Sequence, residues 1–304
     1  MFDSLEFIIA CGGYSTRNYP HSKTGAHKSL MPFGDVRFID FVLKDIIQSG
    51  GRHITIVCSN QHVVDIFKKA LLRDEATEAK LRQSGRTVIA DVLKSTFLPQ
   101  DIDLKFVIQD KPLGTAHVLG LAHRVSRERH GVLIFPDDII VSKNPMEPFI
   151  KRMVESFFKN ERQILLTGRR QKDVSNNSII ENGRLVEKPK VPTSDIAGYS
   201  PIILPKAVMD FIERQTDVLE NGGMLPGKTG LNEWVYVDGI NDFLDTVPEG
   251  HTYNLRMFLL GENEELLDTG SLPLYEKAQL YALLKLSVFK EENRLYVQEL
   301  LKML

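Results

Sequence analysis

A glycine-rich segment followed by two cations, near the start of the chain, is typical of a loop that binds phosphate. Gly12 and Gly13 follow the apolar run of residues 6–11, and Arg17 and Lys28 come shortly afterwards. Glycines let backbone N–H groups approach phosphate oxygens, and an arginine with a lysine can clamp a multiply charged phosphate chain. The glycines alone are equally consistent with a plain turn beside a solvated arginine. Two cations within one loop favour phosphate binding.

Two aspartates far apart in the sequence are candidate ligands of a divalent cation. Asp137 follows the apolar run of residues 131–135, and Asp268 follows another apolar run. Carboxylate oxygens are ligands that Mg²⁺ prefers. Asp138 is the alternative to Asp137, which would then be a turn residue, and we favour Asp137. We find no convincing Ser/His/Asp or Cys/His arrangement, which favours chemistry based on positioning and charge neutralisation.

One match to a phosphate-binding motif is rejected, because the secondary structure predicted around it is not that of a phosphate-binding loop. Residues 222–229 match the pattern G-x-x-x-x-G-K-[ST]. Such a loop must follow a buried strand and open a helix. Here residues 211–221 before it have a helical pattern, and residues 230–236 after it are typical of a loop entering a strand.

The first half of the chain alternates short apolar runs with amphipathic stretches. Strands are predicted at 6–11, 53–58, 104–108, 131–135 and 163–167, and helices at 38–47, 62–72, 116–125 and 149–158. This order predicts an α/β fold, a Rossmann-like doubly wound sheet with helices on both faces. Ligands of such sheets bind beyond the carboxyl ends of the strands.

The second half has a mixed pattern, so the sheet is expected to be mixed rather than fully parallel. Asn182-Gly183 between two short apolar runs predicts a two-residue β-hairpin. Residues 273–304 are helical almost throughout and are expected either to cap the sheet or to contact a second subunit. No repeat or linker divides the chain, so one domain over residues 1–304 is predicted, with 273–304 as its C-terminal helical segment.

The composition narrows the class of protein. There are 38 Lys+Arg and 40 Asp+Glu, giving a net charge of −2, which argues against a dedicated nucleic-acid binder. Cys11 and Cys58 each lie in an apolar run and are read as reduced core thiols. No stretch predicts a signal peptide or a membrane span, so a cytoplasmic protein with no membrane partner is expected.

The loop that follows the first strand resembles the signature of the nucleoside-triphosphate:sugar-1-phosphate nucleotidylyltransferases, or NDP-sugar pyrophosphorylases. Residues 10–17 read ACGGYSTR, and residues 28–32 read KSLMP. The family pattern is A-G-G-x-G-[TS]-R, followed later by P-K before an apolar stretch. Two departures are Ser15, where the family has a third glycine, and His27, where it has a proline. Both cations, Arg17 and Lys28, are retained.

Further motifs occur in the family's order over about residues 5 to 285. They are QDKPLGTAH at 109–117, FPDD at 135–138, EKPK at 187–190 and DTG at 268–270. The resemblance implies nucleotide contacts by Gly12, Gly13, Gln109, Gly114 and Thr115. It also implies sugar-phosphate contacts by Glu187, Lys188 and, on a weaker match, Gly198, with Mg²⁺ held by Asp137 and Asp268. Arg17, Lys28 and Lys188 would neutralise phosphate charge during catalysis.

Bacterial UTP:glucose-1-phosphate uridylyltransferases are similar in length and in the EKPK motif. The resemblance therefore implies uridylyl transfer to glucose-1-phosphate, with other sugars and thymidylyl or guanylyl transfer left open. Two other classes remain: a metal-dependent glycosyltransferase, which would not need the Arg17–Lys28 loop, and a non-catalytic nucleotide-sugar sensor, which Ser15 and His27 allow.

Overall fold

The computed structural model describes residues 1–13, 19, 27–126, 129–144, 147–223, 233–248 and 252–303. The strands are β1 (Leu5–Cys11), β2 (Pro32–Phe33), β3 (Val36–Arg37), β4 (His53–Cys58), β5 (Asp103–Ile108), β6 (His130–Ile134), β7 (Asp138–Ser142), β8 (Gln163–Arg170), β9 (Ser178–Glu181), β10 (Arg184–Glu187), β11 (Ile196–Leu204), β12 (Asn254–Leu259) and β13 (Glu264–Asp268). The helices are α1 (Phe38–Ser49), α2 (Gln61–Ala70), α3 (Glu75–Gln83), α4 (Thr87–Ser95), α5 (Thr115–His123), α6 (Phe149–Phe157), α7 (Lys206–Glu220), α8 (Tyr236–Thr246), α9 (Leu272–Lys285) and α10 (Lys290–Met303).

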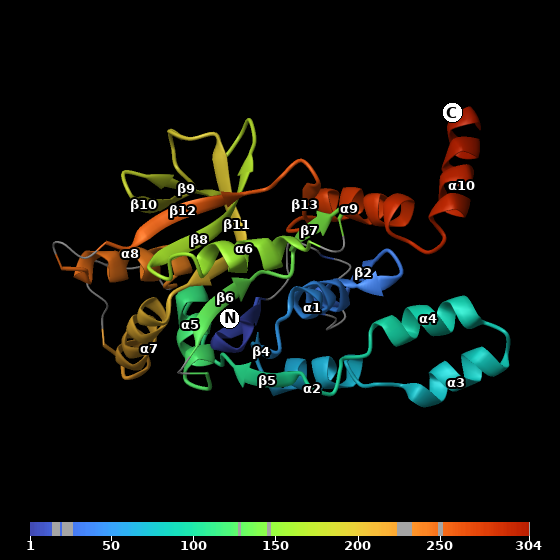
Figure 1. Ribbon diagram of the computed structural model, residues 1–304, viewed down its shortest axis with the longest axis horizontal. Coiled ribbons are helices and arrows are strands. Elements are labelled where there is room, and N and C mark those ends of the chain that lie inside the picture. The colour runs from blue at the N-terminus through green and yellow to red at the C-terminus, as the bar shows by residue number, and fades with distance from the viewer. Residues whose placement is uncertain are drawn as a thin grey trace.

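A mixed sheet forms the centre of the molecule (Figure 1). Strands β6, β1, β4 and β5 are adjacent and parallel, so their carboxyl ends lie at one edge of the sheet. Beyond β6 the neighbouring strand β11 runs antiparallel, and β8, β9 and β10 extend that half. The predicted mixed, doubly wound sheet is thus confirmed, and its parallel half places the segments after β1, β5 and β6 together.

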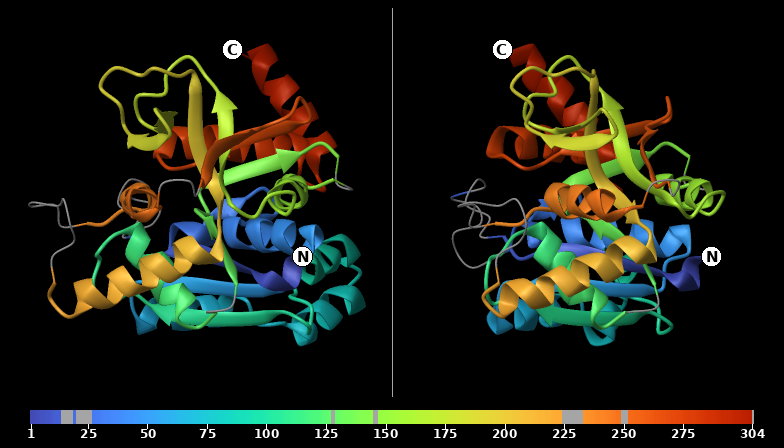
Figure 2. Two further views of the ribbon diagram at one scale, coloured as in Figure 1. Left: turned by 60° about the vertical axis from the view of Figure 1, so that its left-hand side comes forward. Right: turned by 90° about the vertical axis from the view of Figure 1, so that its left-hand side faces the viewer.

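Helices cover both faces of this sheet because the strands are apolar on both sides (Figure 2). On β1, Phe7 and Ile9 contribute to one core, whereas Ile8, between them, contributes to the other. This alternation is the period of two that a strand imposes on its side chains. Helices α1 and α6 pack together on the first face, and α5, α7 and α8 pack together on the second. The second group is the one that shapes the pocket described below.

Most predicted elements occur within one or two residues of their expected bounds, and the hairpin at Asn182-Gly183 is confirmed. Both turn residues have positive φ, 49° and 75°, and β9 and β10 pair antiparallel across them. One prediction is wrong: the segment ending at Tyr236 does not enter a strand, because Tyr236 begins helix α8. The side chain of Asp238 accepts a hydrogen bond from the backbone N of Val235, a capping interaction that starts a helix.

The sequence pattern did not predict α3 and α4, which form a helical pair projecting from one end of the molecule (Figure 1). Helix α3 has no buried residue and α4 buries only Ala90, so neither shows the apolar periodicity of a core helix. In the C-terminal segment, which was predicted to be helical, the structure has the two helices α9 and α10.

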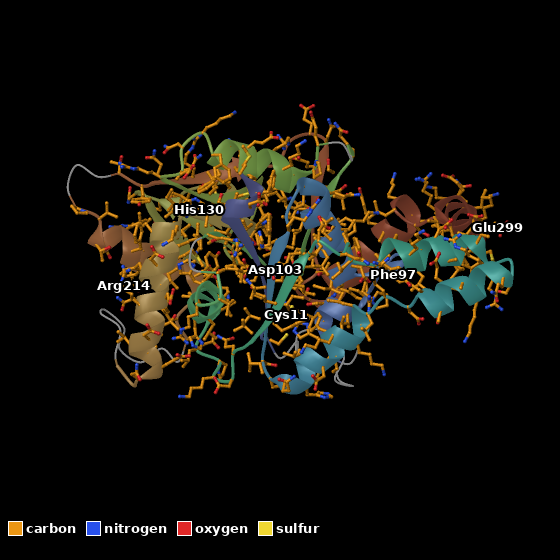
Figure 3. All side chains as sticks on the ribbon, turned by 60° about the horizontal axis from the view of Figure 1, so that its bottom comes forward. Cys11, Phe97, Asp103, His130, Arg214 and Glu299 are labelled. Atoms are coloured by element: carbon orange, nitrogen blue, oxygen red, sulfur yellow. The ribbon has the colours of Figure 1, made fainter. Side chains whose placement is uncertain are left out.

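Cys11 and Cys58 are buried free thiols, as predicted. Cys11 lies in the interior at the end of β1, whereas Glu299 lies on α10, far from the sheet (Figure 3). Burial raises the pKa of Cys11 to about 12, so its thiol is protonated at neutral pH. Among the described helices, none has both the length and the apolar character that crossing a membrane would need.

Candidate functional site

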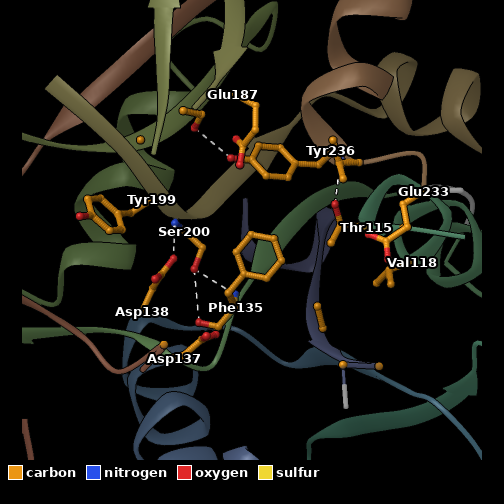
Figure 4. A pocket seen from close by; sticks show the side chains of 18 of the residues that line it. Thr115, Val118, Phe135, Asp137, Asp138, Glu187, Tyr199, Ser200, Glu233 and Tyr236 are labelled. Carbon is orange, nitrogen blue, oxygen red and sulfur yellow. Dashed lines mark hydrogen bonds between the residues drawn. The ribbon is translucent and has the colours of Figure 1, made fainter. Parts of the chain in front are cut away.

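A pocket of about 440 Å³ opens at the carboxyl ends of β1, β5 and β6. Parts of its lining come from β9, β10 and β11 and from the start of α8, so segments far apart in the sequence meet there (Figure 4). Its lining residues include Gly12, Gly13, Lys28, Gln109, Gly114, Thr115, Asp137, Asp138, Ser178, Glu187, Gly198, Ser200, Tyr236 and Asp268. Ligands of open α/β sheets bind beyond the carboxyl ends of the strands, and this pocket lies at such a position.

One end of the pocket is built on Gly114, the residue that precedes helix α5. Gly114 has φ 103° and ψ 178°, a backbone region that essentially only glycine adopts. A Cβ at this position would lie 2.3 Å from the carbonyl oxygen of Trp234. The close approach is fixed by hydrogen bonds from Trp234 N to Leu113 O, 2.7 Å, and from Ala116 N to Trp234 O, 3.0 Å. Residues 113–116 and 234–236 therefore form one wall.

Gln109 lies against this wall and against the loop after β1. Its Nε2 donates to the carbonyl oxygen of Gly114 over 2.9 Å. On the other side, a Cβ added at Gly12 would lie 2.7 Å from Oε1 of Gln109, so the amide needs a glycine there. The amide is thereby held at the pocket surface between the two glycines.

The middle of the pocket is charged. Nζ of Lys28 lies 2.6 Å from a carboxylate oxygen of Asp137, and both side chains are mostly buried. The backbone of Asp137 is held in place because its carbonyl oxygen accepts hydrogen bonds from the N and Oγ1 of Thr269. Asp268 precedes Thr269 and lies directly opposite Asp138 in the antiparallel pair β7–β13. The structure thus brings Asp268 close to Asp137 and Asp138, which precede it by about 130 positions in the sequence.

Asp138 has a different environment from its neighbour Asp137. Its carboxylate accepts a hydrogen bond from the backbone N of Ser200, 2.9 Å, and so faces strand β11 (Figure 4). Burial and the adjacent charge of Asp137 raise the pKa of Asp138 to about 7. Asp138 therefore joins β7 to β11 as well as lining the pocket.

The far end of the pocket is formed by Glu187, Gly198 and their neighbours. A Cβ at Gly198 would lie 2.6 Å from the Oγ of Ser178, so a larger residue would displace that hydroxyl. Ser178 in turn lies 2.9 Å from the hydroxyl of Tyr236. Burial raises the pKa of Glu187, and the charge of Lys188 opposes that shift.

Ten of the residues expected to bind substrate or metal line this one pocket: Gly12, Gly13, Lys28, Gln109, Gly114, Thr115, Asp137, Glu187, Gly198 and Asp268. Lys188 is exposed and is not among the lining residues, although its backbone N donates to Asn177 O beside the pocket. Arg17 lies outside the described residues, so its role in a clamp with Lys28 stays a prediction.

The pocket also contains polar residues that the sequence did not point to, among them Ser178, Ser200 and Tyr236. Ser178 and Ser200 carry no signal of their own, because a serine in or beside an apolar strand is common. The pattern of residues 230–236 indicates a loop entering a strand, so it does not predict Tyr236 at the start of a helix. The backbone N of Tyr236 in fact donates to Oγ1 of Thr115 over 2.8 Å, which ties the start of α8 to the start of α5.

Similar proteins are known in sequence and in structure. The chain is 25% identical over 225 residues to a UTP–glucose-1-phosphate uridylyltransferase of Streptococcus pyogenes, covering 68% of this chain and 73% of that protein. In structure it is similar to a UDP-glucose pyrophosphorylase of Acinetobacter baumannii, with a TM-score of 0.78, 19% identity and coverage of 97% and 99% of the two chains. A UTP-bound structure of an enzyme from that organism gives a TM-score of 0.75 at 19% identity, with the same coverage.

The sequence profile of the nucleotidyl transferase family matches residues 6–224 of this chain. The matched region contains the glycine-rich end of β1, the Gln109–Thr115 wall and Asp137, and the related structures share the mixed sheet that carries them. The chain therefore belongs to the nucleotidyl transferase family.

Proposed function

We propose that the protein transfers a uridylyl group from UTP to glucose-1-phosphate, forming UDP-glucose and pyrophosphate. The observation that supports this most is that one pocket is lined by residues suited to the base, to the phosphates and to the sugar. The wall with Gln109 and Gly114 would receive the base, Lys28 and the aspartates would receive the phosphates, and Glu187 with Gly198 would receive the sugar. The relatives named above support the choice of uracil and glucose.

In the proposed reaction an oxygen of the sugar phosphate attacks the α-phosphorus of UTP in line. The bond from that phosphorus to the bridging oxygen breaks, and pyrophosphate leaves with the electron pair. The attacking oxygen is already anionic at neutral pH, so no side chain has to remove a proton. The protein's task is to hold two anions together, which Lys28 favours by its positive charge.

The residues in the middle of the pocket fit a magnesium ion. Mg²⁺ is usually held by one or two carboxylates together with substrate phosphates, and Asp137 and Asp268 would be those carboxylates. When bound, the ion would neutralise negative charge on the phosphates.

The proposed function is tested by pyrophosphate release. The protein should release pyrophosphate from UTP only when glucose-1-phosphate is present, and UDP-glucose should accumulate in equal amount. A panel of nucleoside triphosphates and sugar-1-phosphates measures how selective the reaction is. The Asp137→Asn variant, purified in the same way, reports any activity carried over from the expression host. Absence of release with every pair would rule out the proposal.

Replacing Lys188 by alanine should raise the KM for glucose-1-phosphate by at least about tenfold, with a KM for UTP within about twofold of the wild type. The reason is the loss of a cation beside Glu187, at the sugar end of the pocket. Lys188 has φ 47°, and alanine tolerates this conformation about as well as lysine does, so the backbone is expected to persist. Steady-state kinetics with each substrate varied in turn measures the two constants.

The matched control for this prediction is Lys190→Ala, because Lys190 is an exposed lysine of the same segment. Lys190→Ala should leave the KM for glucose-1-phosphate and the KM for UTP unchanged. Equal increases in the two KM values of Lys188→Ala would show that Lys188 does not act on the sugar phosphate.

A further inference from the structure

The amide of Gln109 is oriented by two acceptors. Its Nε2 lies 2.9 Å from the carbonyl oxygen of Gly114 and 3.1 Å from Nδ1 of His117. A carbonyl oxygen can only accept, so the NH₂ group and not the oxygen of the amide must face Gly114. One N–H of the amide then donates to Gly114 O and the other donates to His117 Nδ1, so neither is left for a ligand.

This arrangement sets the proton on the imidazole of His117. Because Nδ1 accepts from Gln109, the ring proton is on Nε2, which lies 3.1 Å from a carboxylate oxygen of Glu220. The other carboxylate oxygen of Glu220 lies 2.6 Å from the guanidinium of Arg124, which holds it in place. The chain of hydrogen bonds therefore runs in one direction, from Gln109 through His117 to Glu220.

The remaining polar atom of this amide is available to a ligand. Gln109 lines the pocket but is only 7% exposed. Across the described ranges, its Oε1 has no hydrogen-bond partner. An acceptor that faces the pocket and has no protein partner can bind a ligand that brings a donor.

We propose that His117, oriented by Glu220, is a positioning residue that makes Gln109 present an acceptor to the base and so selects uracil over cytosine. Uracil has an N–H at N3, which can donate to Oε1, whereas N3 of cytosine is itself an acceptor and would be repelled. A reversed amide would do the opposite, because its NH₂ group would favour cytosine. His117 does not line the pocket and acts only through Gln109. This inference rests on the proposed binding of the base at Gln109.

The test compares kcat/KM for UTP and for CTP in variants of His117. His117→Leu removes one of the two acceptors of the Gln109 NH₂ group and leaves one of its N–H groups without a partner, so the preference for UTP over CTP should fall by about tenfold or more. His117→Asn restores an acceptor, because its side-chain oxygen can take the place of Nδ1, and should leave the preference close to that of the wild type, within about 1.5-fold. A role limited to packing would not be rescued in this ratio by a smaller, polar residue.

His123→Leu is the matched control, since His123 is also fully buried on α5 and is bonded to Asp210 of the same helix α7. It should lower the stability but leave the UTP:CTP ratio unchanged. Glu220→Ala is a second variant in case His117→Leu does not fold, because the side chain of Glu220 is 31% exposed. It frees the ring proton to move to Nδ1, so the ratio should fall by about threefold.

The outcomes separate this inference from the proposed function. Uridylyl transfer with an unchanged UTP:CTP ratio in His117→Leu and Glu220→Ala would overturn the inference and leave the function standing. If neither the wild type nor any variant shows uridylyl transfer, calorimetry measures the dissociation constants of UTP and CTP. Their ratio then replaces the ratio of kcat/KM values. A preference for UTP that is lost in His117→Leu and kept in His117→Asn would then uphold the inference while the proposed function fails.

Discussion

Asp137→Asn is expected to lower kcat by about a thousandfold, because the substitution removes the negative charge of a proposed Mg²⁺ ligand from the middle of the pocket. The half-saturating concentration of Mg²⁺ should rise by about tenfold or more. Asparagine keeps the backbone, whose carbonyl oxygen is bonded to Thr269 N at 2.9 Å and to Thr269 Oγ1 at 3.0 Å. The variant should therefore fold, and initial rates over a magnesium titration measure both effects.

The loss of the ion pair with Lys28 is the competing explanation, and Lys28→Met distinguishes the two. Asp137 and Lys28 are in contact, so either substitution breaks the pair. Lys28→Met should also reduce the rate, but its magnesium requirement should not rise, because both aspartates remain. An Asp137→Asn enzyme with an unchanged magnesium requirement would show that Asp137 serves only to hold Lys28.

Gly114→Ala is expected to destabilise the protein by about 3 kcal/mol or more and to weaken UTP binding severely. Two costs combine at this position. Alanine does not readily adopt φ 103° with ψ 178°, and its Cβ would meet the backbone of Trp234 at 2.3 Å. The wall can relieve the contact only by separating residues 113–116 from 234–236, which breaks the bonds that define this end of the pocket. Urea unfolding measures the stability, and calorimetry measures UTP binding.

Gly85→Ala is the matched control for that prediction. Gly85 also has positive φ, 77°, but nothing lies within 4 Å of a Cβ at that site. Gly85→Ala should lower the free energy of unfolding by only about 1 kcal/mol, through backbone strain, and UTP binding should not change. Equal destabilisation by the two variants would mean that the contact with Trp234 contributes nothing.

Local patterns in the sequence predicted much of the fold. Residues 6–11 and 53–58 are apolar on both faces of a strand, and β1 and β4 occur there within one residue. Asn182-Gly183 predicted its hairpin because few other pairs adopt two consecutive positive φ angles easily. The pattern failed at α3 and α4, where almost nothing is buried, and at α8, where a cap outweighs the strand-like composition of residues 234–237.

The sequence by itself determined which residues could do the chemistry: glycines at the end of β1, an amide and a glycine after β5, and an acid after β6. Only the tertiary structure decided what those residues do together. The pairing of β7 with β13 sets Asp268 opposite Asp138, and the packing of α5 against α7 places Glu220 behind His117. Strand and helix periods are local properties that can be read along the chain. The direction of the Gln109 amide depends on partners that only long-range packing brings within hydrogen-bond distance.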